Sequence, residues 1–315
     1  MREYLVRRAL YGVVVLWGVS VIIFLLIRLI PGDAVYLLFG EEVFTQAQVD
    51  ELRIVLGLNK PMWRQYTDWT WGVVRGDFGT SLQTGEPVLA RIMKRLPISL
   101  EITFLSMGLG MLMAIPIGVI SAIRQDTGLD YSLRVVAIVG LSIPSFWLGT
   151  ILLVMPSVWW HWVPPLGFAS LIDDPWKNLQ QIAFPVVVLS LILSAGVMRL
   201  ARSSLLEVMR QDYIRTAWAK GLDEKTVVVR HALKNAMIPV VTLWGVQMGR
   251  LLGGTVILES IFSIPGLGRL TLEAIMIRDY TQVQGNIMFY ALIFFVINLL
   301  VDITYAWIDP RIKYE

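Results

Sequence analysis

Six long apolar stretches alternate with polar and charged segments along the chain. They cover residues 9–27, 102–123, 135–160, 178–198, 238–258 and 280–301, and only the fifth contains a charged residue, Arg250. A helix of about 20 residues, rising 1.5 Å per residue, crosses the ~30 Å hydrocarbon layer of a bilayer. Runs this long and uniformly apolar do not suit barrel strands, which alternate over ~10 residues. The pattern predicts an all-α integral membrane protein with six transmembrane helices.

Lysine and arginine residues are distributed unevenly over the segments between the predicted spans. With the N-terminus inside, the inner segments 1–8, 124–134, 199–235 and 302–315 hold 15 of them, whereas the short outer loops 161–177 and 259–279 hold three. Short loops rich in these residues stay on the cytoplasmic side of a membrane. The first outer segment, 31–98, holds seven, but long translocated segments follow this rule weakly. We therefore expect both termini in the cytoplasm.

The spans predict four regions: an N-terminal transmembrane helix (1–30), an outer helical segment (31–98), a core of five transmembrane helices (99–308) and a cytoplasmic tail (309–315). The outer segment is too long for a simple connection and should have structure of its own. A capping box at Thr45 and Gln48 begins one expected helix, and Pro61 opens a second that extends to about Val74. These helices could lie on the bilayer surface or form a docking surface for an external solute-carrying protein.

Composition supports a membrane location and excludes several kinds of chemistry. The chain is 56% hydrophobic and 16% charged, against roughly 25% charged residues in soluble domains. It has no cysteine and two histidines, His161 and His231, so thiolate sites are excluded and a histidine metal cluster is not expected. No Gly-Lys dipeptide occurs, so a phosphate-binding loop of the form GxxxxGK(S/T) is absent from the sequence. We expect no catalytic residue, metal, cofactor or nucleic-acid partner for this chain.

The longest inner loop, around 203–235, is also the most basic. A helix over about 204–220 is expected to end at Gly221, which suits the left-handed position after a helix, and Asp223 can cap the next helix. Ala217 and Gly221 are four residues apart, and two small residues there would leave a shallow place for another chain. An amphipathic helix in such a loop can lie on the membrane, pack on its own chain or insert into a groove of a partner. On physical grounds these alternatives stay open.

The same loop carries a stretch that resembles the EAA loop of bacterial ABC importer permeases. It consists of Asp212, Tyr213, Ile214, Arg215, Thr216, Ala217, Trp218, Ala219, Lys220, Gly221 and Leu222. Arg215-Thr216-Ala217 stands where the name of the motif expects Glu-Ala-Ala, a form that is familiar in the peptide/nickel branch. In that family this loop is a coupling helix that docks on the ATPase subunit. The resemblance implies the same role here.

Further stretches resemble the dipeptide/oligopeptide/nickel branch of these permeases over nearly the whole chain. They include Gly76-Asp77-Phe78-Gly79, Ser142-Ile143-Pro144-Ser145-Phe146, Glu259-Ser260-Ile261-Phe262, Pro265-Gly266-Leu267-Gly268, Arg278-Asp279-Tyr280 and Asp309-Pro310-Arg311-Ile312. The resemblance implies a type I importer fold in the bacterial inner membrane. The implied partners are a second homologous permease, two ATPase subunits that bind ATP and Mg²⁺, and an external solute-binding protein.

The resemblance favours dipeptides or oligopeptides as the solute, moved from the binding protein to the cytoplasm. A nickel chelate, glutathione or an oligosaccharide carried by the same machinery is an alternative. A self-contained secondary transporter is the alternative from another class, and it would need intramembrane carboxylates for ion coupling. No Asp or Glu lies in the middle of a predicted span, which disfavours that class.

Four residues of the fifth predicted span are candidates for the pore or for an interface between helices. Gly245, Gly249 and Gly253 form a GxxxGxxxG ridge, which lets transmembrane helices approach closely. Tight helix packing is one interpretation, and a cavity wall or the interface with the second permease is the other. Arg250 lies near the middle of the span, where a charge is costly, so we expect it to face the pore or an acidic partner.

Overall fold

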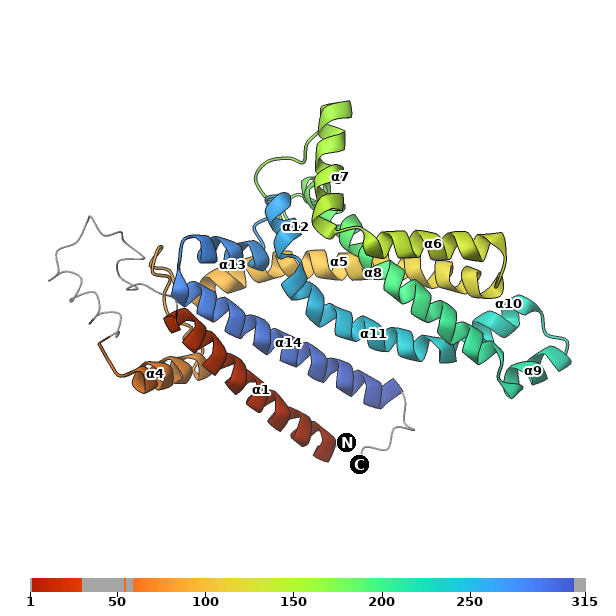
Figure 1. The fold of residues 1–315 in the computed structure, drawn as a ribbon, viewed down its shortest axis with the longest axis horizontal. Coiled ribbons are helices and arrows are strands. Elements are labelled where there is room, and N and C mark those ends of the chain that lie inside the picture. The colour runs from red at the N-terminus through yellow and green to blue at the C-terminus, as the bar shows by residue number, and fades with distance from the viewer. Residues whose placement is uncertain (1, 30–53, 55–58, 309–315) are drawn as a thin grey trace. The chain divides into compact units, whose positions relative to one another are not determined.

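The computed structural model describes residues 2–29, 54 and 59–308, and this part of the chain is helical (Figure 1). Within it, the β-type pairing consists of a single bridge between Thr80 and Pro87. The all-α class predicted from the apolar runs is therefore confirmed for the described residues. The helix expected after Thr45 and the tail at 309–315 lie outside them.

The chain divides into two compact units. Of the described residues, the first contains 2–29, 54, 59–99 and 265–299, and the second contains 100–264 and 300–308. Two long helices, α5 (Val88–Ile123) and α14 (Tyr280–Ile308), contribute residues to both units.

In the first unit, α4 packs on α1 through aromatic side chains. These helices span Arg2–Leu29 (α1) and Met62–Val74 (α4), so the helix predicted after Pro61 is confirmed with its predicted end. The ring centroid of Phe24 lies 5.3 Å from that of Tyr66 and 6.3 Å from that of Trp69. On α4, Trp63 and Trp71 stay exposed. The helix therefore covers the first span with one face, and both interpretations of its other face remain open.

The rest of the first unit is a core that joins the start of α5 to α13 (Leu267–Met276) and α14. Its buried side chains are Phe78, Val88, Ile92, Leu267, Leu270 and Phe289. The loop before α5 comes close to α14, because a Cβ on Gly79 would lie 2.8 Å from the Cγ2 atom of Thr281. Gly79 also has φ +84, a conformation that L side chains rarely adopt, so a glycine is required there twice over.

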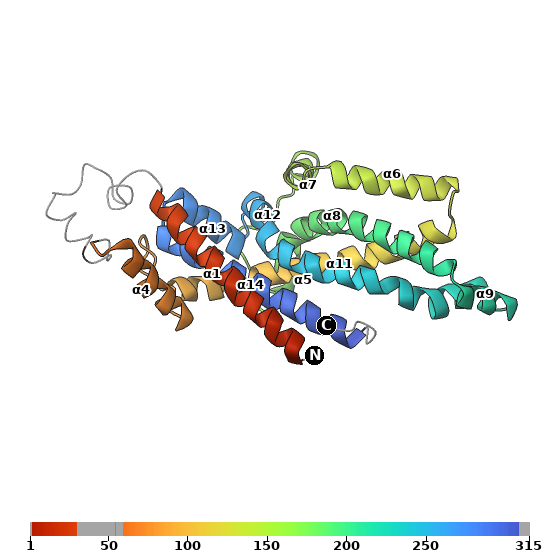
Figure 2. The same ribbon diagram turned by 60° about the horizontal axis from the view of Figure 1, so that its bottom comes forward.

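The second unit is arranged around α8. Its other complete helices are α6 (Gly128–Ser142), α7 (Ser145–Trp160), α9 (Asp212–Ala219), α10 (Glu224–Thr226), η1 (Val227–Ala232), α11 (Leu233–Gly254) and α12 (Val256–Ile261). Helix α8 (Pro175–Met209) lies against α6, α7 and α11, and it buries residues along most of its length (Figures 1 and 2). Small residues allow α5 to approach it closely. A Cβ on Gly118 would lie 2.9 Å from the Cβ atom of Ala201.

The third predicted span is wrong as a single helix. Residues 128–160 form α6 and α7, which are bent by 94° at the break between Ser142 and Ser145 (Figure 2). Pro144 has no N–H, and it disfavours helical backbone in the preceding residue. Accordingly Ile143 is extended, with φ −81 and ψ 123, and α7 begins after Pro144. Pro156 and Pro185 lie inside helices, so proline alone did not predict the break.

The fifth predicted span is also interrupted. Helix α11 ends at Gly254, and α12 begins at Val256 after the junction residue Thr255. The described chain has four helices long and apolar enough to cross a membrane, or up to five if the bent α6–α7 pair is one span. The four are α1, α5, α8 and α14, and the stretches that qualify are Val6–Leu29, Val88–Ile123, Pro175–Met209 and Tyr280–Ile303. Several membrane spans are thus confirmed, and the number six stays a prediction.

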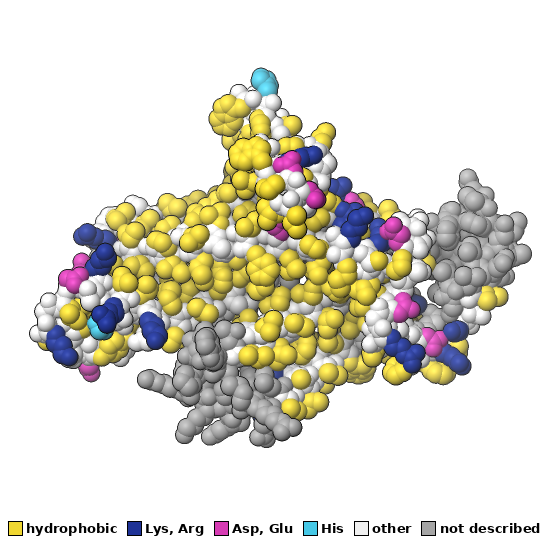
Figure 3. Space-filling model, turned by 180° about the vertical axis from the view of Figure 1, so that it is seen from behind, with side chains coloured by type: hydrophobic (Ala, Val, Ile, Leu, Met, Phe, Trp, Pro, Cys, Tyr) yellow, Lys and Arg dark blue, Asp and Glu magenta, His cyan; other side chains and the backbone are white. Residues whose placement is uncertain are grey.

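Most lysine and arginine side chains of the second unit lie at one end. Figure 3 shows apolar side chains over the helical body of this unit and lysine and arginine side chains at the end that carries α9 and α10. Apolar surface in contact with lipid and charged surface in contact with water would produce this separation.

Candidate functional site

The candidate site begins where α8 ends. The helix predicted over 204–220 is wrong as one element, because α8 stops at Met209 and α9 begins at Asp212. Gln211 between them is extended, with φ −74 and ψ 149. This turn brings Ile214 into the same buried cluster as Leu205 of α8, which a continuous helix would carry away from it.

The residues that end α9 and start the next helix were predicted correctly. Gly221 has φ +77, and its N–H donates to the carbonyl oxygen of Trp218. The carboxylate of Asp223 accepts a hydrogen bond of 3.2 Å from the N–H of Thr226, as expected for a helix cap. Hydrogen bonds from the Thr226 side chain and backbone lower the pKa of Asp223. The ionised cap then leads into η1, a π-helical segment.

The inner face of α9 packs on its own chain. Ile214 and Ala217 are buried in a cluster with Ala122, Leu205, Val227, Val228, Ala232 and Ala236. Ala217 is only 6% exposed. The shallow place for another chain expected beside Ala217 is therefore wrong, since α8 and η1 already fill that side. This packing anchors α9 to the end of α8.

The outer face of α9 is uncovered in the chain. Tyr213 and Trp218 are each 43% exposed, and the side chains of Asp212 and Arg215 are 96% and 75% exposed. The Tyr213 hydroxyl accepts a hydrogen bond of 2.8 Å from the Nδ2 atom of Asn235. Thr216, Ala219, Lys220 and Gly221 are also exposed, and Leu222 is half-buried against the cluster. The predicted coupling residues thus form one helix with a buried anchor and an exposed polar–aromatic face.

The four candidates in α11 have different surroundings. A Cβ on Gly245 would lie 2.6 Å from two methyl carbons of Val301, so this glycine permits close helix packing. Gly249 is buried, whereas a Cβ on Gly253 would have no neighbour within 4 Å. Arg250 is exposed and makes no hydrogen bond or ion pair with the described part of the chain. The ridge is therefore close-packed at one end and open at the other, and a pore role for it stays a prediction.

The sequence did not reveal a buried ion pair that joins α6 to α8 in the second unit. Asp130 of α6 is fully buried and accepts hydrogen bonds of 2.8 and 2.7 Å from the Nε and Nη2 atoms of Arg202 on α8. Ser121 and the N–H of Asp126 also donate to it. The local signal was the cap at Thr127, whose hydroxyl accepts from the N–H of Asp130. Its partner is 72 residues away, so local spacing does not reveal the pair.

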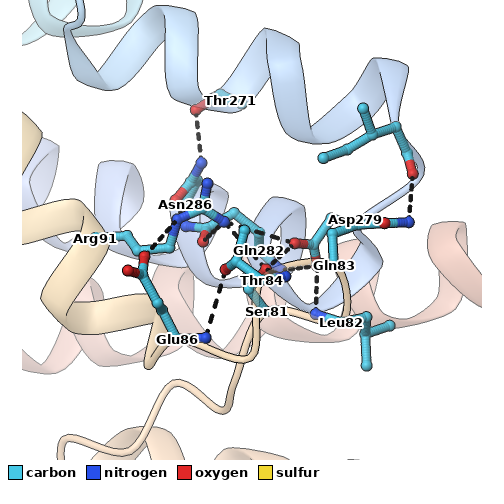
Figure 4. Close-up of polar contacts among 11 residues, drawn as sticks. Ser81, Leu82, Gln83, Thr84, Glu86, Arg91, Thr271, Asp279, Gln282 and Asn286 are labelled. Carbon is cyan, nitrogen blue, oxygen red and sulfur yellow. Dashed lines mark hydrogen bonds and ion pairs between the residues drawn. The ribbon is translucent and has the colours of Figure 1, made fainter.

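A second buried polar network, in the first unit, ties the loop before α5 to α13 and α14 (Figure 4). Asp279 is fully buried and accepts hydrogen bonds from the Ser81 hydroxyl and from the N–H of Leu82. Arg91 donates to Ser81 at 3.1 Å and to Gln282 at 3.0 Å. The chain of bonds continues from Gln282 to Asn286 and from Asn286 to Thr271. The sequence signal was the Arg278-Asp279-Tyr280 motif, which the resemblance included without a role.

Comparison with known families decides the identity. Residues 114–314 match the family described as "binding-protein-dependent transport system inner membrane component", and residues 1–103 match the family of N-terminal segments of such membrane components. The chain belongs to this family. The permease resemblance inferred from the motifs is thereby confirmed.

Curated relatives extend over the full length of the permease. It is 40% identical, over an alignment of 334 residues, to a dipeptide transport system permease protein of Alkalihalophilus pseudofirmus, with both chains fully covered. It is 36% identical over 338 residues to the dipeptide transport system permease protein of Escherichia coli K12, again with full coverage of both. A putative peptide transport system permease protein of Brucella abortus is 36% identical over 315 residues, all of both chains.

Solved structures agree on the fold. The permease resembles a chain of the MetNI methionine ABC transporter in an inward-facing conformation, with a TM-score of 0.57 and 16% identity over 70% of this chain and 96% of that one. An amino acid ABC transporter structure gives a TM-score of 0.51 at 16% identity, over 71% of this chain and 94% of the other. At this identity the likeness concerns the fold alone. The permease is a membrane-embedded transport subunit with the fold of ABC importer permeases.

Proposed function

We propose that this chain is a pore-forming permease subunit of an ATP-driven peptide importer, and that α9 is its coupling helix. The observation that carries the coupling role is the two-faced packing of α9. Ile214 and Ala217 anchor it to the end of α8, while Tyr213, Arg215 and Trp218 remain exposed. A helix held in this way can transmit a movement of its partner to the span behind it.

The partners follow from the family and from what the sequence lacks. Because no Gly-Lys dipeptide occurs, ATP and Mg²⁺ would bind in separate ATPase chains rather than in this one. We infer two such ATPases, a second homologous permease and an external solute-binding protein. This chain itself then carries out no covalent chemistry. With α9 docked on the ATPases, both termini and the tail at 309–315 lie in the cytoplasm, and the segment 31–98 lies outside.

Peptides are the proposed solute because full-length relatives at 36–40% identity are dipeptide or peptide transport permeases. The named alternatives are a nickel chelate, glutathione and an oligosaccharide. Uptake of a labelled dipeptide into vesicles that contain both permeases and both ATPases tests the choice. It should require ATP and the binding protein, and excess unlabelled dipeptide should suppress it. Suppression by a nickel chelate but not by dipeptide would contradict the peptide assignment.

The coupling role can be tested by crosslinking, because the chain has no cysteine of its own. Arg215→Cys and Trp218→Cys place single thiols on the exposed face of α9. Each thiol would carry a photoreactive maleimide in the assembled importer. Both variants should crosslink to an ATPase subunit. The matched control is Leu112→Cys, on α5, where the native side chain is 74% exposed in the middle of a candidate span.

The control thiol should label and yet give no ATPase adduct. If neither α9 position crosslinks in a complex that hydrolyses ATP, the coupling assignment is wrong. A purified permease that transports solute in liposomes under an ion gradient, with no ATPase present, would instead support a secondary transporter.

A further inference from the structure

A cavity of about 440 Å³ lies between α6 and α8 in the second unit. Its walls are formed by Arg134, Ile138, Gly196, Arg199, Leu200, Arg202 and Ser203. Three arginines therefore meet in one cavity whose other walls are mainly apolar or small. From here α8 continues to Met209, close to the start of α9.

Of the three arginines, Arg202 is the one that hydrogen-bonds a carboxylate in the described part of the chain. Arg202 forms the two hydrogen bonds with Asp130 that were described above, and Ser121 and the backbone of Asp126 also bind that carboxylate. The Nε atom of Arg134 is buried and has no hydrogen-bond partner. It forms a longer ion pair with Asp130, 3.9 Å from the Oδ1 atom of that carboxylate. Arg199 is exposed and has no hydrogen bond or ion pair with the described part of the chain. The cavity thus keeps an excess of positive charge that an anion can neutralise.

Apolar surface continues from the cavity along α6. Ile138 is 56% exposed, and Val135 and Val139 on the same helix are 58% and 51% exposed. A free inorganic anion would gain nothing from this surface, whereas an acyl chain would be removed from water by it. The site therefore suits an amphiphile with a negatively charged head and an apolar tail.

We propose that this cavity binds the phosphate headgroup of an anionic phospholipid, with an acyl chain along the exposed face of α6. Guanidinium groups bind phosphate oxygens through paired, charge-assisted hydrogen bonds, for which Arg134 and Arg199 have free donors. Basic pockets between transmembrane helices on the cytoplasmic side are suited to such headgroups. Placing this lipid in the inner leaflet rests on the proposed function, which puts α9 on the cytoplasmic side.

The bound lipid would act on coupling through α8. It would join Arg134 on α6 to Arg199 on α8 beside the existing Asp130–Arg202 pair. Since α8 leads directly to α9, we expect the lipid to stiffen the connection between the docking surface and the spans. Anionic lipid should therefore raise the uptake achieved per ATP hydrolysed.

Native mass spectrometry of the full-length purified permease tests lipid binding directly. Phosphatidylglycerol should bind, whereas phosphatidylcholine should bind much more weakly. A basic residue near an anionic headgroup contributes about fivefold in affinity, so Arg199→Gln should weaken binding about fivefold and the double variant Arg134→Gln/Arg199→Gln about 25-fold. Arg202 is left unchanged because it neutralises Asp130.

Arg124→Gln is the matched control, because Arg124 is exposed on the loop before α6 and does not line the cavity. It should bind phosphatidylglycerol like the unmodified protein. Equal binding by the double variant would overturn the proposal. If millimolar inorganic phosphate displaces the lipid, the cavity binds a soluble anion and not a lipid headgroup. If a dipeptide displaces it, the cavity belongs to the path of the solute.

The coupling role of α9 and the lipid site can be refuted independently of each other. Loss of ATPase crosslinking at α9 with intact, arginine-dependent lipid binding would refute the coupling role alone. Intact crosslinking, with lipid binding that is unchanged when Arg134 and Arg199 are substituted, would refute the lipid site alone.

Discussion

Asp130 and Asp279 are both fully buried carboxylates, yet the two units neutralise them in different ways. Asp130 in the second unit has a direct ion pair, with two hydrogen bonds from Arg202 at 2.7–2.8 Å. Asp279 in the first unit is bound by a hydroxyl and by backbone N–H groups, and its nearest guanidinium nitrogen, on Arg91, is 3.7 Å away.

The difference shows two solutions to the same desolvation problem. A buried charge is costly unless it is paired and its lone pairs are satisfied. At Asp130 one residue, Arg202, supplies both guanidinium hydrogen bonds, and the pair adds a polar link to the apolar packing of α6 on α8. At Asp279 the compensation is divided among several neutral donors, and Arg91 acts mainly through Ser81 and Gln282. We therefore expect the second unit to depend on one arginine and the first unit to tolerate the loss of its arginine better.

The largest effect is expected for Arg202→Gln. It removes both guanidinium hydrogen bonds from the buried Asp130 and leaves Arg134, 3.9 Å away, as its nearest cation. Breaking a buried pair costs about 3–5 kcal/mol. The free energy of unfolding, measured by denaturant titration of the detergent-solubilised protein, should fall by that amount. The double variant Asp130→Asn/Arg202→Gln should recover part of the loss, because it removes the uncompensated charge. If the double variant is no more stable than the single one, the pair does not act as described.

A smaller loss is expected for Arg91→Gln. The glutamine removes a charged donor, but the hydroxyl of Ser81 and the N–H groups of Leu82 and Gln282 still bind Asp279. Hydrogen bonds to charged groups contribute about 1.5–3 kcal/mol, which bounds the loss in the same titration. A loss as large as that of Arg202→Gln would mean that Asp279 depends on a single ion pair after all.

The smallest effects should come from the two serines that donate to these carboxylates. Ser121→Ala and Ser81→Ala each remove one hydroxyl donor to a carboxylate that keeps its other donors, so we expect a loss of about 1.5 kcal/mol, the lower end of the range for hydrogen bonds to charged groups. Ser81 should cost more, because its oxygen also accepts from Arg91 and from the N–H of Thr84. Thermal unfolding of the two variants side by side measures the order. The reverse order would show that the comparison of the two sites is wrong.

Local features near α9 were predictable because their causes are local. Gly221 and Asp223 act through the backbone within three residues, and both were identified from residue type and spacing. The end of the predicted helix at Val74 was likewise confirmed. By contrast, the break of α8 before α9 arises because Ile214 packs into a cluster with distant residues such as Val228. The helical periodicity across 204–220 does not depend on that packing, so it could not predict the break.

The bend at Pro144 was predictable from the sequence only in part. The residue was visible in the sequence, but Pro156 and Pro185 remain inside α7 and α8. A proline permits a break, and the packing around it decides whether the helix is interrupted. Here the bend allows both α6 and α7 to pack against α8. A single straight helix over residues 128–160 could not make both sets of contacts.

The sequence alone determined that this protein is helical, lies in a membrane and belongs among binding-protein-dependent permeases, because long apolar runs and short motifs are readable along the chain. Only the tertiary structure decided which face of α9 is exposed, which arginine neutralises Asp130 and which residues hold Asp279. Ser81 and Asp279 are separated by 198 residues, so their contact exists only once the chain is folded. Burial raises the energetic cost of an unpaired charge, and the fold alone determines which groups are buried together.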